Sequence, residues 1–213
     1  MYIKIFVFNP FKVNTYLLYD DTRECIIIDA ACYEKDEVSA LLNFITEKEL
    51  KPKALLSTHG HVDHICGNIF FKDQFSLPLL MHKDDNYLIN AAVQYGKIFG
   101  FIIDQPPSPT GFIEQGDTYR FGNSSLEILH APGHSPGSVM FYSGEDKFLI
   151  AGDVLFSGSI GRTDLPKGNY GTLISSIKSK ILTLPEDTRV YSGHGNSTTI
   201  KKEKETNPFL QEI

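Results

Sequence analysis

The stretch Thr58-His59-Gly60-His61-Val62-Asp63-His64 decides the fold of this chain, because it places four metal-binding side chains within six residues. The run before it, residues 53–57, is typical of a buried strand, and the apolar positions of residues 65–75 recur at helical spacing. The four side chains therefore lie at a strand-to-helix turn, where a tight loop can direct them into one cavity. Imidazole and carboxylate ligands favour zinc, iron or manganese.

Three further candidate ligands, His134, Asp153 and His194, each follow a run that predicts a strand. Those runs are residues 126–129, 148–152 and 189–193. Because each candidate lies just beyond a strand, all of them can converge at one edge of a sheet or sandwich. Five of the seven histidines fall in these segments, a distribution that solvated surface histidines would not show.

The number of candidate ligands predicts two metal ions. Five histidines and two aspartates are too many for one four-coordinate ion, but they suit two ions about 3.5 Å apart that share a carboxylate and a water. Spacing within the first cluster suggests the partition. One ion is assigned His59, His61 and His134, the other is assigned Asp63, His64 and His194, and Asp153 bridges them. Asp63 and Asp153 are also the predicted catalytic carboxylates.

This ordered set of seven residues resembles the metallo-β-lactamase superfamily, and the similarity runs through nearly the whole chain. Residues 14–18 and 26–29 are similar to the opening strands of that superfamily. Residues 152–156 and 161–166 resemble the branch that contains glyoxalase II and persulfide dioxygenase. The short glyoxalase II-like hydrolases are the most similar, on the evidence of Gly193-His194-Gly195, Thr198-Thr199-Ile200 and Asn207-Pro208-Phe209-Leu210.

The resemblance implies an α/β fold, a four-layer αββα sandwich in which helices cover two mixed β-sheets. At 213 residues and 41% apolar content the chain can bury a sizeable core, and no linker or repeat divides it, so we expect one domain over residues 1–213. Strand-like patterns at residues 1–8, 15–19 and 25–29 suit this fold. Helical patterns at residues 34–47 and 170–181 do so as well.

Composition narrows the cellular setting and the partners. Three cysteines, with no CxxC pair and no signal-peptide pattern, predict a reducing cytoplasm. A formal charge of −6 without a basic cluster argues against nucleic acid, and no apolar run is long enough for a membrane span. Cys66 lies two residues after His64, so it is either a metal ligand or a small buried side chain behind the metal loop.

The site predicts a hydrolase. A water that bridges two divalent ions is a hydroxide near neutral pH, because the cations lower its pKa to ~7. A thioester suits this nucleophile, since its thiolate leaves without a strong general acid. We expect zinc, with iron or manganese also compatible. The resemblance to glyoxalase II implies a small-molecule thioester linked to glutathione, such as S-2-hydroxyacylglutathione (S-lactoylglutathione).

Two residues next to the ligands have two possible roles each. Asp29 ends a run of isoleucines, and it either accepts the free N–H of a ligating histidine or caps a turn. Arg162 corresponds to a basic residue that holds the glutathione moiety in glyoxalase II enzymes, where it would bind a carboxylate. The alternative for Arg162 is an ion pair with Asp164.

The chain departs from the longer glyoxalase II enzymes in ways that broaden the substrate prediction. Those enzymes carry a C-terminal helical domain with further glutathione contacts, and they place an aromatic residue just after the ligand that matches His194. A broader set of thioesters, or another acyl carrier, is therefore compatible. Residues 82–110 are rich in aromatics and prolines, and they form either a short packed helix or a mobile flap over the metals. His82 and His130 lie outside the ligand pattern and are expected to be structural.

Other functions use the same residues. A persulfide dioxygenase would hold one iron through two histidines and a carboxylate, and a lactonase would use the same hydroxide. β-Lactamase activity is disfavoured, because the antibiotic-hydrolysing enzymes of the common subclass have cysteine at the position of Asp153. A non-catalytic metal or electron-transfer module would not need seven ligands and a bridging carboxylate.

Overall fold

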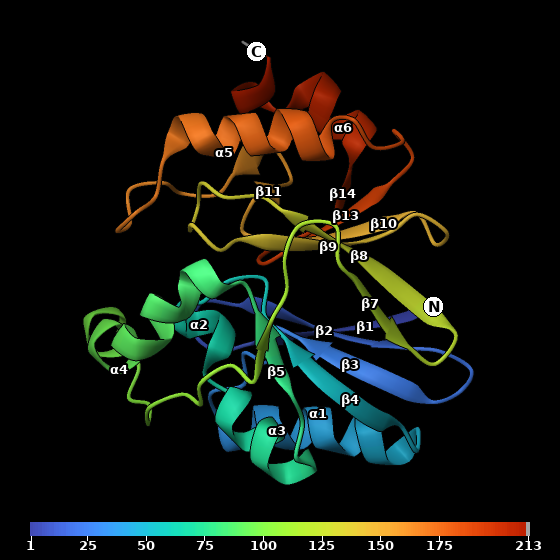
Figure 1. The fold of residues 1–213 in the computed structure, drawn as a ribbon, viewed down its shortest axis with the longest axis vertical. Coiled ribbons are helices and arrows are strands. Elements are labelled where there is room, and N and C mark those ends of the chain that lie inside the picture. The colour runs from blue at the N-terminus through green and yellow to red at the C-terminus, as the bar shows by residue number, and fades with distance from the viewer. Residues whose placement is uncertain (212–213) are drawn as a thin grey trace.

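In the computed structural model, which describes residues 1–211, two β-sheets lie face to face and helices cover both outer faces (Figure 1). The first sheet is six-stranded and its strands follow chain order: β1 (Tyr2–Phe8), β2 (Val13–Tyr19), β3 (Glu24–Ile28), β4 (Lys51–Leu56), β5 (Leu79–Met81) and β6 (Gly111–Phe112). Strands β1 to β3 are antiparallel neighbours, whereas β3 to β6 pair in parallel. The sheet is therefore mixed.

The second sheet is also six-stranded and mixed, because β10 and β13 pair in parallel while its other pairs are antiparallel. Across the sheet its strands are β14 (Thr198–Thr199), β13 (Arg189–Ser192), β10 (Phe148–Gly152), β9 (Val139–Ser143), β8 (Ser124–His130) and β7 (Thr118–Phe121). A separate small hairpin joins β11 (Leu155–Phe156) to β12 (Ser159–Ile160).

Helices form the two outer layers. The first sheet is covered by α1 (Lys35–Glu47) and α3 (Asn68–Phe75), and the second by α5 (Tyr170–Ser176) and α6 (Ile200–Thr206) (Figure 1). Helices α2 (Val62–Ile65) and α4 (Asn86–Phe99) lie at the edge of the sandwich, and short turns η1 (Lys83–Asp85) and η3 (Pro208–Leu210) complete the elements. The expected αββα sandwich is confirmed.

Alternation along the central strands explains why the chain forms these layers. Successive side chains of a strand point to opposite faces, and here both faces are buried. On β3, Ile27 packs toward the α1 layer whereas Ile26 and Ile28 pack between the two sheets. On β10, Leu149 packs toward α5 and α6, while Ile150 joins the core between the sheets. Continuous apolar runs of this kind are typical of doubly covered sheets.

The predicted helix over residues 65–75 is interrupted, because α2 ends at Ile65 and α3 begins at Asn68. Gly67 lies at the break and donates its N–H to the carbonyl of Ala30 at 2.8 Å. A Cβ on Gly67 would lie 2.7 Å from that carbonyl oxygen, so only glycine allows the chain to pass so close. The break separates the ligand-bearing turn α2 from the covering helix α3.

The predicted helix over residues 170–181 also differs in detail. It begins as α5 and continues from Ile177 to Ile181 as a π-helix, η2. Both Ile177 and Ile181 are fully buried against the second sheet. The helix expected over residues 34–47 is confirmed as α1, with Glu34 at its N-cap. Within residues 1–211, no helix is both long and apolar enough to cross a membrane.

Candidate metal centre

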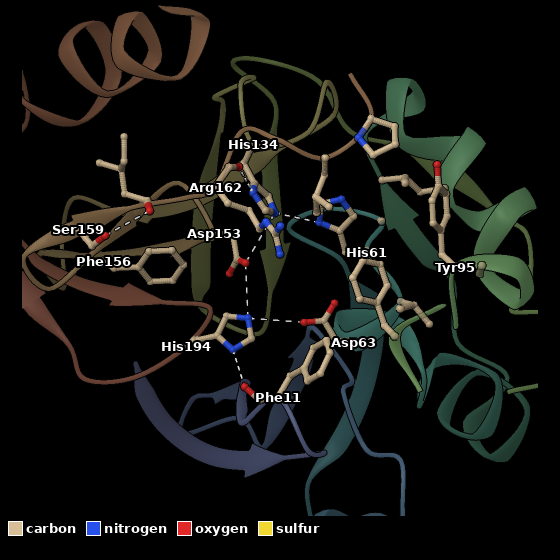
Figure 2. A pocket seen from close by; sticks show the side chains of 18 residues that line it. Phe11, His61, Asp63, Tyr95, His134, Asp153, Phe156, Ser159, Arg162 and His194 are labelled. Carbon is tan, nitrogen blue, oxygen red and sulfur yellow. Dashed lines mark hydrogen bonds and ion pairs between the residues drawn. The ribbon is translucent and has the colours of Figure 1, made fainter. Parts of the chain in front are cut away.

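The seven candidate ligands come from the ends of strands in both sheets and meet at one edge of the sandwich. Figure 2 shows His61, Asp63, His134, Asp153 and His194 of this set. His59 and His61 lie in the loop after β4, and Asp63 and His64 lie on the short helix α2 that follows. The other three side chains come from the second sheet. His134 follows β8, Asp153 follows β10 and His194 follows β13.

The first group of side chains consists of His59, His61 and His134. The Nε2 atom of His134 lies 2.9 Å from Nδ1 of His61 and 3.3 Å from Nε2 of His59. Each of the three residues offers one nitrogen that lies within 4.8 Å of the nitrogens offered by the other two. His59 and His134 are almost fully buried. These three residues form the grouping that the sequence spacing predicts for one ion.

The second group consists of Asp63, His64 and His194, again with ligand atoms within 4.8 Å. Nε2 of His194 lies 3.3 Å from Nε2 of His64 and 3.6 Å from Oδ2 of Asp63. Asp153 lies between the groups. Its carboxylate is 3.6 Å from Nε2 of His134 in the first group and 3.5 Å from Nε2 of His194 in the second. The position of Asp153 is therefore that of a shared carboxylate.

The hydrogen bonds behind the imidazoles fit a metal centre. Nδ1 of His134 lies 2.8 Å from the carbonyl of Arg162, and Nδ1 of His194 lies 2.9 Å from the carbonyl of Phe11. A carbonyl only accepts, so each Nδ1 carries the hydrogen and the opposite Nε2 presents a lone pair to the centre. His64 donates from Nδ1 to Asp29 in the same way, at 2.9 Å. Ligating histidines are held in this manner in metalloproteins.

The distances between the facing histidine nitrogens also fit a bound metal ion. Two nitrogens bound to one tetrahedral zinc at ~2.0–2.1 Å are about 3.4 Å apart, close to the 3.3 Å between His59 and His134 and between His64 and His194. Oδ1 of Asp153 is buried and has no hydrogen-bond partner among residues 1–211. A buried carboxylate oxygen without a donor normally has a compensating cation.

The protonation states of the candidate ligands also favour a bound cation. Burial lowers the pKa of His59 and His61 well below the usual value, and neighbouring imidazoles add to this, so both rings are neutral and able to bind a cation. Burial alone would raise the pKa of Asp153, but the charge of His64 and contacts with His194 outweigh it and hold that pKa well below its usual range. His59 and His61 therefore offer neutral nitrogens. Against the effect of burial, the charge of Asp153 raises the pKa of His64 and of His194, so a cation bound by those two rings would displace their protons.

Asp29 contacts a candidate ligand, which is the first of the two roles that the sequence left open, and it also binds the segment that follows β4. It is fully buried, and Oδ1 accepts the backbone N–H of Thr58 at 2.7 Å. Oδ2 accepts from the Thr58 hydroxyl at 2.7 Å and from Nδ1 of His64 at 2.9 Å. The Thr58 oxygen lies in turn 3.0 Å from Nδ1 of His59. Asp29 thus orients one histidine directly and a second one through Thr58.

Asp85 is a supporting residue that sequence reasoning missed. It is fully buried, and its carboxylate accepts from the backbone N–H groups of Gly60 at 2.9 Å and Gly137 at 2.6 Å, and from the Ser135 hydroxyl at 2.6 Å. It therefore ties the loop of His59 and His61 to the loop of His134. The sequence signal was weak, because Asp84-Asp85 before a helix is also typical of an ordinary solvated helix start.

Asp85→Asn is expected to lower the free energy of unfolding by about 2–4 kcal/mol, because one carboxylate oxygen becomes an NH₂ that faces an N–H donor in either amide orientation. The melting temperature should fall by roughly 5–15 °C. The matched control is Asp84→Asn, whose side chain is about half exposed and should change stability little. Thermal unfolding of both variants tests this, and equal stabilities would contradict a bridging role for Asp85.

A cavity of about 550 Å³ opens over the ligands (Figure 2). The helix expected in residues 82–110 is present as α4, and its Tyr95 and Phe99 line the cavity, while residues 101–110 have no helix or strand. Phe101 is buried against Tyr33 and Phe11, whereas Phe112 is half exposed. The mobile-flap alternative stays a prediction.

Arg162 lines the same cavity, and its guanidinium forms two hydrogen bonds of 2.7 Å with the carboxylate of Asp164. The ion pair expected as one alternative is therefore present, and the role of Arg162 in substrate binding stays a prediction. Cys66 donates from Sγ to the carbonyl of Ala31 at 3.1 Å, and burial raises its pKa to about 12. Within the described part of the chain, Cys66 belongs to none of the groups whose ligand atoms lie close enough to share an ion, which favours packing behind the metal loop.

His82 and His130 lie apart from the seven candidate ligands. Their rings stack with centroids 4.1 Å apart and planes 11° apart, and Asp84 lies beside them. Ligand atoms of these three residues lie within 4.8 Å of one another, but Nδ1 of His82 already accepts the backbone N–H of Asp84 at 3.3 Å. Nε2 of His130 also lies 2.8 Å from the carbonyl of Pro136, which supports the His134 loop. A packing role accounts for both residues.

A two-sheet sandwich with a histidine and aspartate cluster at the strand ends defines the class of metal-dependent hydrolases with the αββα fold. The chain belongs to the metallo-β-lactamase superfamily, whose family model matches residues 8–194. It is 39% identical over 212 residues to the hydroxyacylglutathione hydrolase GloC of Haemophilus influenzae, which covers 99% of this chain and 98% of that protein. The family resemblance expected from the motifs is confirmed.

Two solved structures share the fold along the full length of the chain. The structure of BLEG-1, described as a B3 metallo-β-lactamase, superposes with a TM-score of 0.90 at 37% identity, covering 99% of this chain and 100% of that one. TTHA1623, solved in a di-iron-bound form, superposes with a TM-score of 0.87 at 36% identity and the same coverage. Proteins similar to this chain are thus named after different substrates, a hydroxyacylglutathione for GloC and a β-lactam for BLEG-1. Membership of the superfamily alone therefore does not define the substrate.

Proposed function

We propose that this protein hydrolyses thioesters at a two-metal centre, releasing a carboxylic acid and a thiol. The observation that carries the proposal is the pair of ligand groups on either side of Asp153, at the floor of the cavity. The name of the similar GloC protein supports a hydroxyacylglutathione as one substrate. The ligand set accommodates zinc, iron or manganese, and we propose zinc first, with the di-iron form of TTHA1623 as a reason to test iron.

Two divalent ions bound here would supply a hydroxide nucleophile at neutral pH and a positive charge for the oxygen of the substrate carbonyl. His59, His61 and His134 would hold one ion, Asp63, His64 and His194 the other, and Asp153 both. The chain orients these side chains in advance through Asp29, Thr58 and the carbonyls of Phe11 and Arg162. Preorganisation of this kind reduces the reorganisation needed during the reaction.

A thioester suits the remaining side chains of the cavity. Water adds to the acyl carbon, the C–S bond breaks, and the thiolate takes up a proton after it leaves. A thiol has a pKa of about 8.5, so its anion leaves without a general acid.

The test is release of free thiol from S-D-lactoylglutathione by the purified protein, before and after treatment with a chelator. We expect release that chelation abolishes and that added zinc, iron or manganese restores. No release from metal-replete protein would contradict the thioesterase proposal. That result would favour the persulfide dioxygenase and lactonase alternatives, which oxygen consumption with glutathione persulfide and hydrolysis of a lactone would separate.

A further inference from the structure

The walls of the cavity are apolar although its floor is polar. One wall is a single face of α4, on which Leu88, Ala92, Tyr95 and Phe99 recur at the three- and four-residue spacing of a helix. Figure 2 shows Tyr95 on this side of the cavity and Phe156 on the opposite side. Phe156 and Ile160, from the β11–β12 hairpin, belong to that second wall.

The aromatic residues of the α4 wall are not simply core residues. Leu88 and Ala92 are buried, but Tyr95 and Phe99 are only partly buried and line the cavity. Phe99 is held in place by an edge-to-face contact with Phe11, whose ring centroid is 6.2 Å away and which also lines the cavity. Partly exposed rings next to a reaction centre offer apolar contact area to a ligand.

Charged groups that could hold a charged carrier are scarce. Among the described residues, those that line the cavity include one cation of fixed charge, Arg162, and two carboxylates, Asp63 and Asp153, which belong to the ligand groups. Both hydrogen bonds from Arg162 to Asp164 are short, and this exposed pair neutralises itself. A carrier with several carboxylates, such as glutathione, would find few partners on these walls.

We propose that the preferred substrates are thioesters of apolar acyl groups, such as medium-chain or aromatic acyl groups, and that the charge of the thiol carrier has little influence. This inference rests on the proposed thioesterase function. The acyl carbonyl lies at the polar floor, and the acyl chain extends along the apolar walls. Specificity then comes from apolar burial, which adds a nearly constant increment for each methylene group.

The experiment is a series of N-acetylcysteamine thioesters from acetyl to hexanoyl, hydrolysed by the metal-loaded protein. We expect kcat/KM to rise about threefold for each added methylene, somewhat less than the fourfold gain of full burial, and roughly 80-fold from acetyl to hexanoyl. Exchange of N-acetylcysteamine for glutathione at constant acyl group should change kcat/KM by less than about fivefold, because one self-paired arginine contributes little to binding.

Two variants on adjacent positions of α4 link the preference to the wall. Phe99→Ala should lower the ratio of hexanoyl to acetyl kcat/KM by about fivefold, because part of the apolar contact is lost. Ile98→Ala is the matched control: Ile98 is 67% exposed and is not among the cavity-lining residues, so the ratio should stay within twofold. A ratio that Phe99→Ala leaves unchanged would contradict the assigned wall.

The possible failures are distinguishable. If kcat/KM is flat with acyl length and follows the carrier, the acyl preference is overturned while the thioesterase function stands. If no thioester of any length is hydrolysed, the proposed function fails. Calorimetric titration of the metal-loaded protein with hexanoate and acetate then tests the cavity by itself. Tighter binding of hexanoate supports an apolar ligand site, and equal or weaker binding overturns it.

Discussion

Asp153→Asn is expected to lower kcat/KM for thioester hydrolysis by about 10³-fold and to reduce the metal content by at least one ion per chain. Asp153 is the carboxylate that both histidine groups face, and its buried Oδ1 has no hydrogen-bond donor in the described part of the chain. An amide of the same shape removes the negative charge and places an NH₂ against a cation. Loss of about 4 kcal/mol of metal-derived stabilisation corresponds to this factor.

Two measurements test this prediction, and a thermal unfolding curve of the metal-free variant excludes a folding defect. Elemental analysis after dialysis gives the metal content, and the thiol-release assay gives kcat/KM. The control is Asp187→Asn, since Asp187 is an exposed partner of Lys147 away from the metal-binding edge and should keep both values. If Asp153→Asn retains the full metal content and activity, a bridging role for Asp153 is excluded.

Asp29→Asn is expected to weaken metal binding by about 10–100-fold, the range seen when groups that orient metal ligands are changed. If the amide oxygen keeps its bond to the N–H of Thr58, the NH₂ group faces His64 and the Thr58 hydroxyl. His64 must then accept at Nδ1 and carry its hydrogen at Nε2, the atom that faces the centre. The Thr58 hydroxyl, no longer bound to a carboxylate, can donate to Nδ1 of His59 with the same result.

Competition with a chromogenic chelator measures the affinity of the protein for the metal ion. Nitrogen NMR of labelled histidine reports which ring nitrogen carries the hydrogen. Asp29 has a positive φ of 52°, a conformation that asparagine also adopts, so the backbone should tolerate the change. The control is Asp21→Asn, where an exposed carboxylate accepts from Tyr2. Unchanged affinity with Nδ1 still protonated would refute the proposed relay through Thr58.

The layers and the grouping of the candidate ligands were predictable from local patterns. Apolar runs such as Ile26-Ile27-Ile28 predict strands that are covered on both faces, and each candidate ligand follows a segment that predicts a strand. Because strand ends meet at sheet edges, His59 and His134 had to approach each other once the two sheets packed. The ligand role of the seven residues stays a prediction, but their grouping around Asp153 is the one that spacing indicated.

Contacts between distant segments were not predictable. The bridge from Asp85 to Gly60 and Gly137 depends on where two loops from different sheets meet, and no local pattern encodes that distance. The break at Gly67 has the same origin, since it is imposed by the carbonyl of Ala30 on another segment. Helical periodicity describes which side of a helix is buried, but it does not describe what the backbone of the helix touches.

The origin of the two ligand groups has a consequence for folding. Each group contains two residues from the first sheet, His59 with His61 and Asp63 with His64, and a single residue from the second, His134 or His194. Every cation bound there would cross-link the halves of the sandwich. A cation that only the folded chain binds, at a hundred times its dissociation constant, adds about 2.7 kcal/mol to folding. Chelation would then lower the free energy of unfolding by weakening the contact between the two halves at the metal-binding edge, in addition to abolishing the proposed activity.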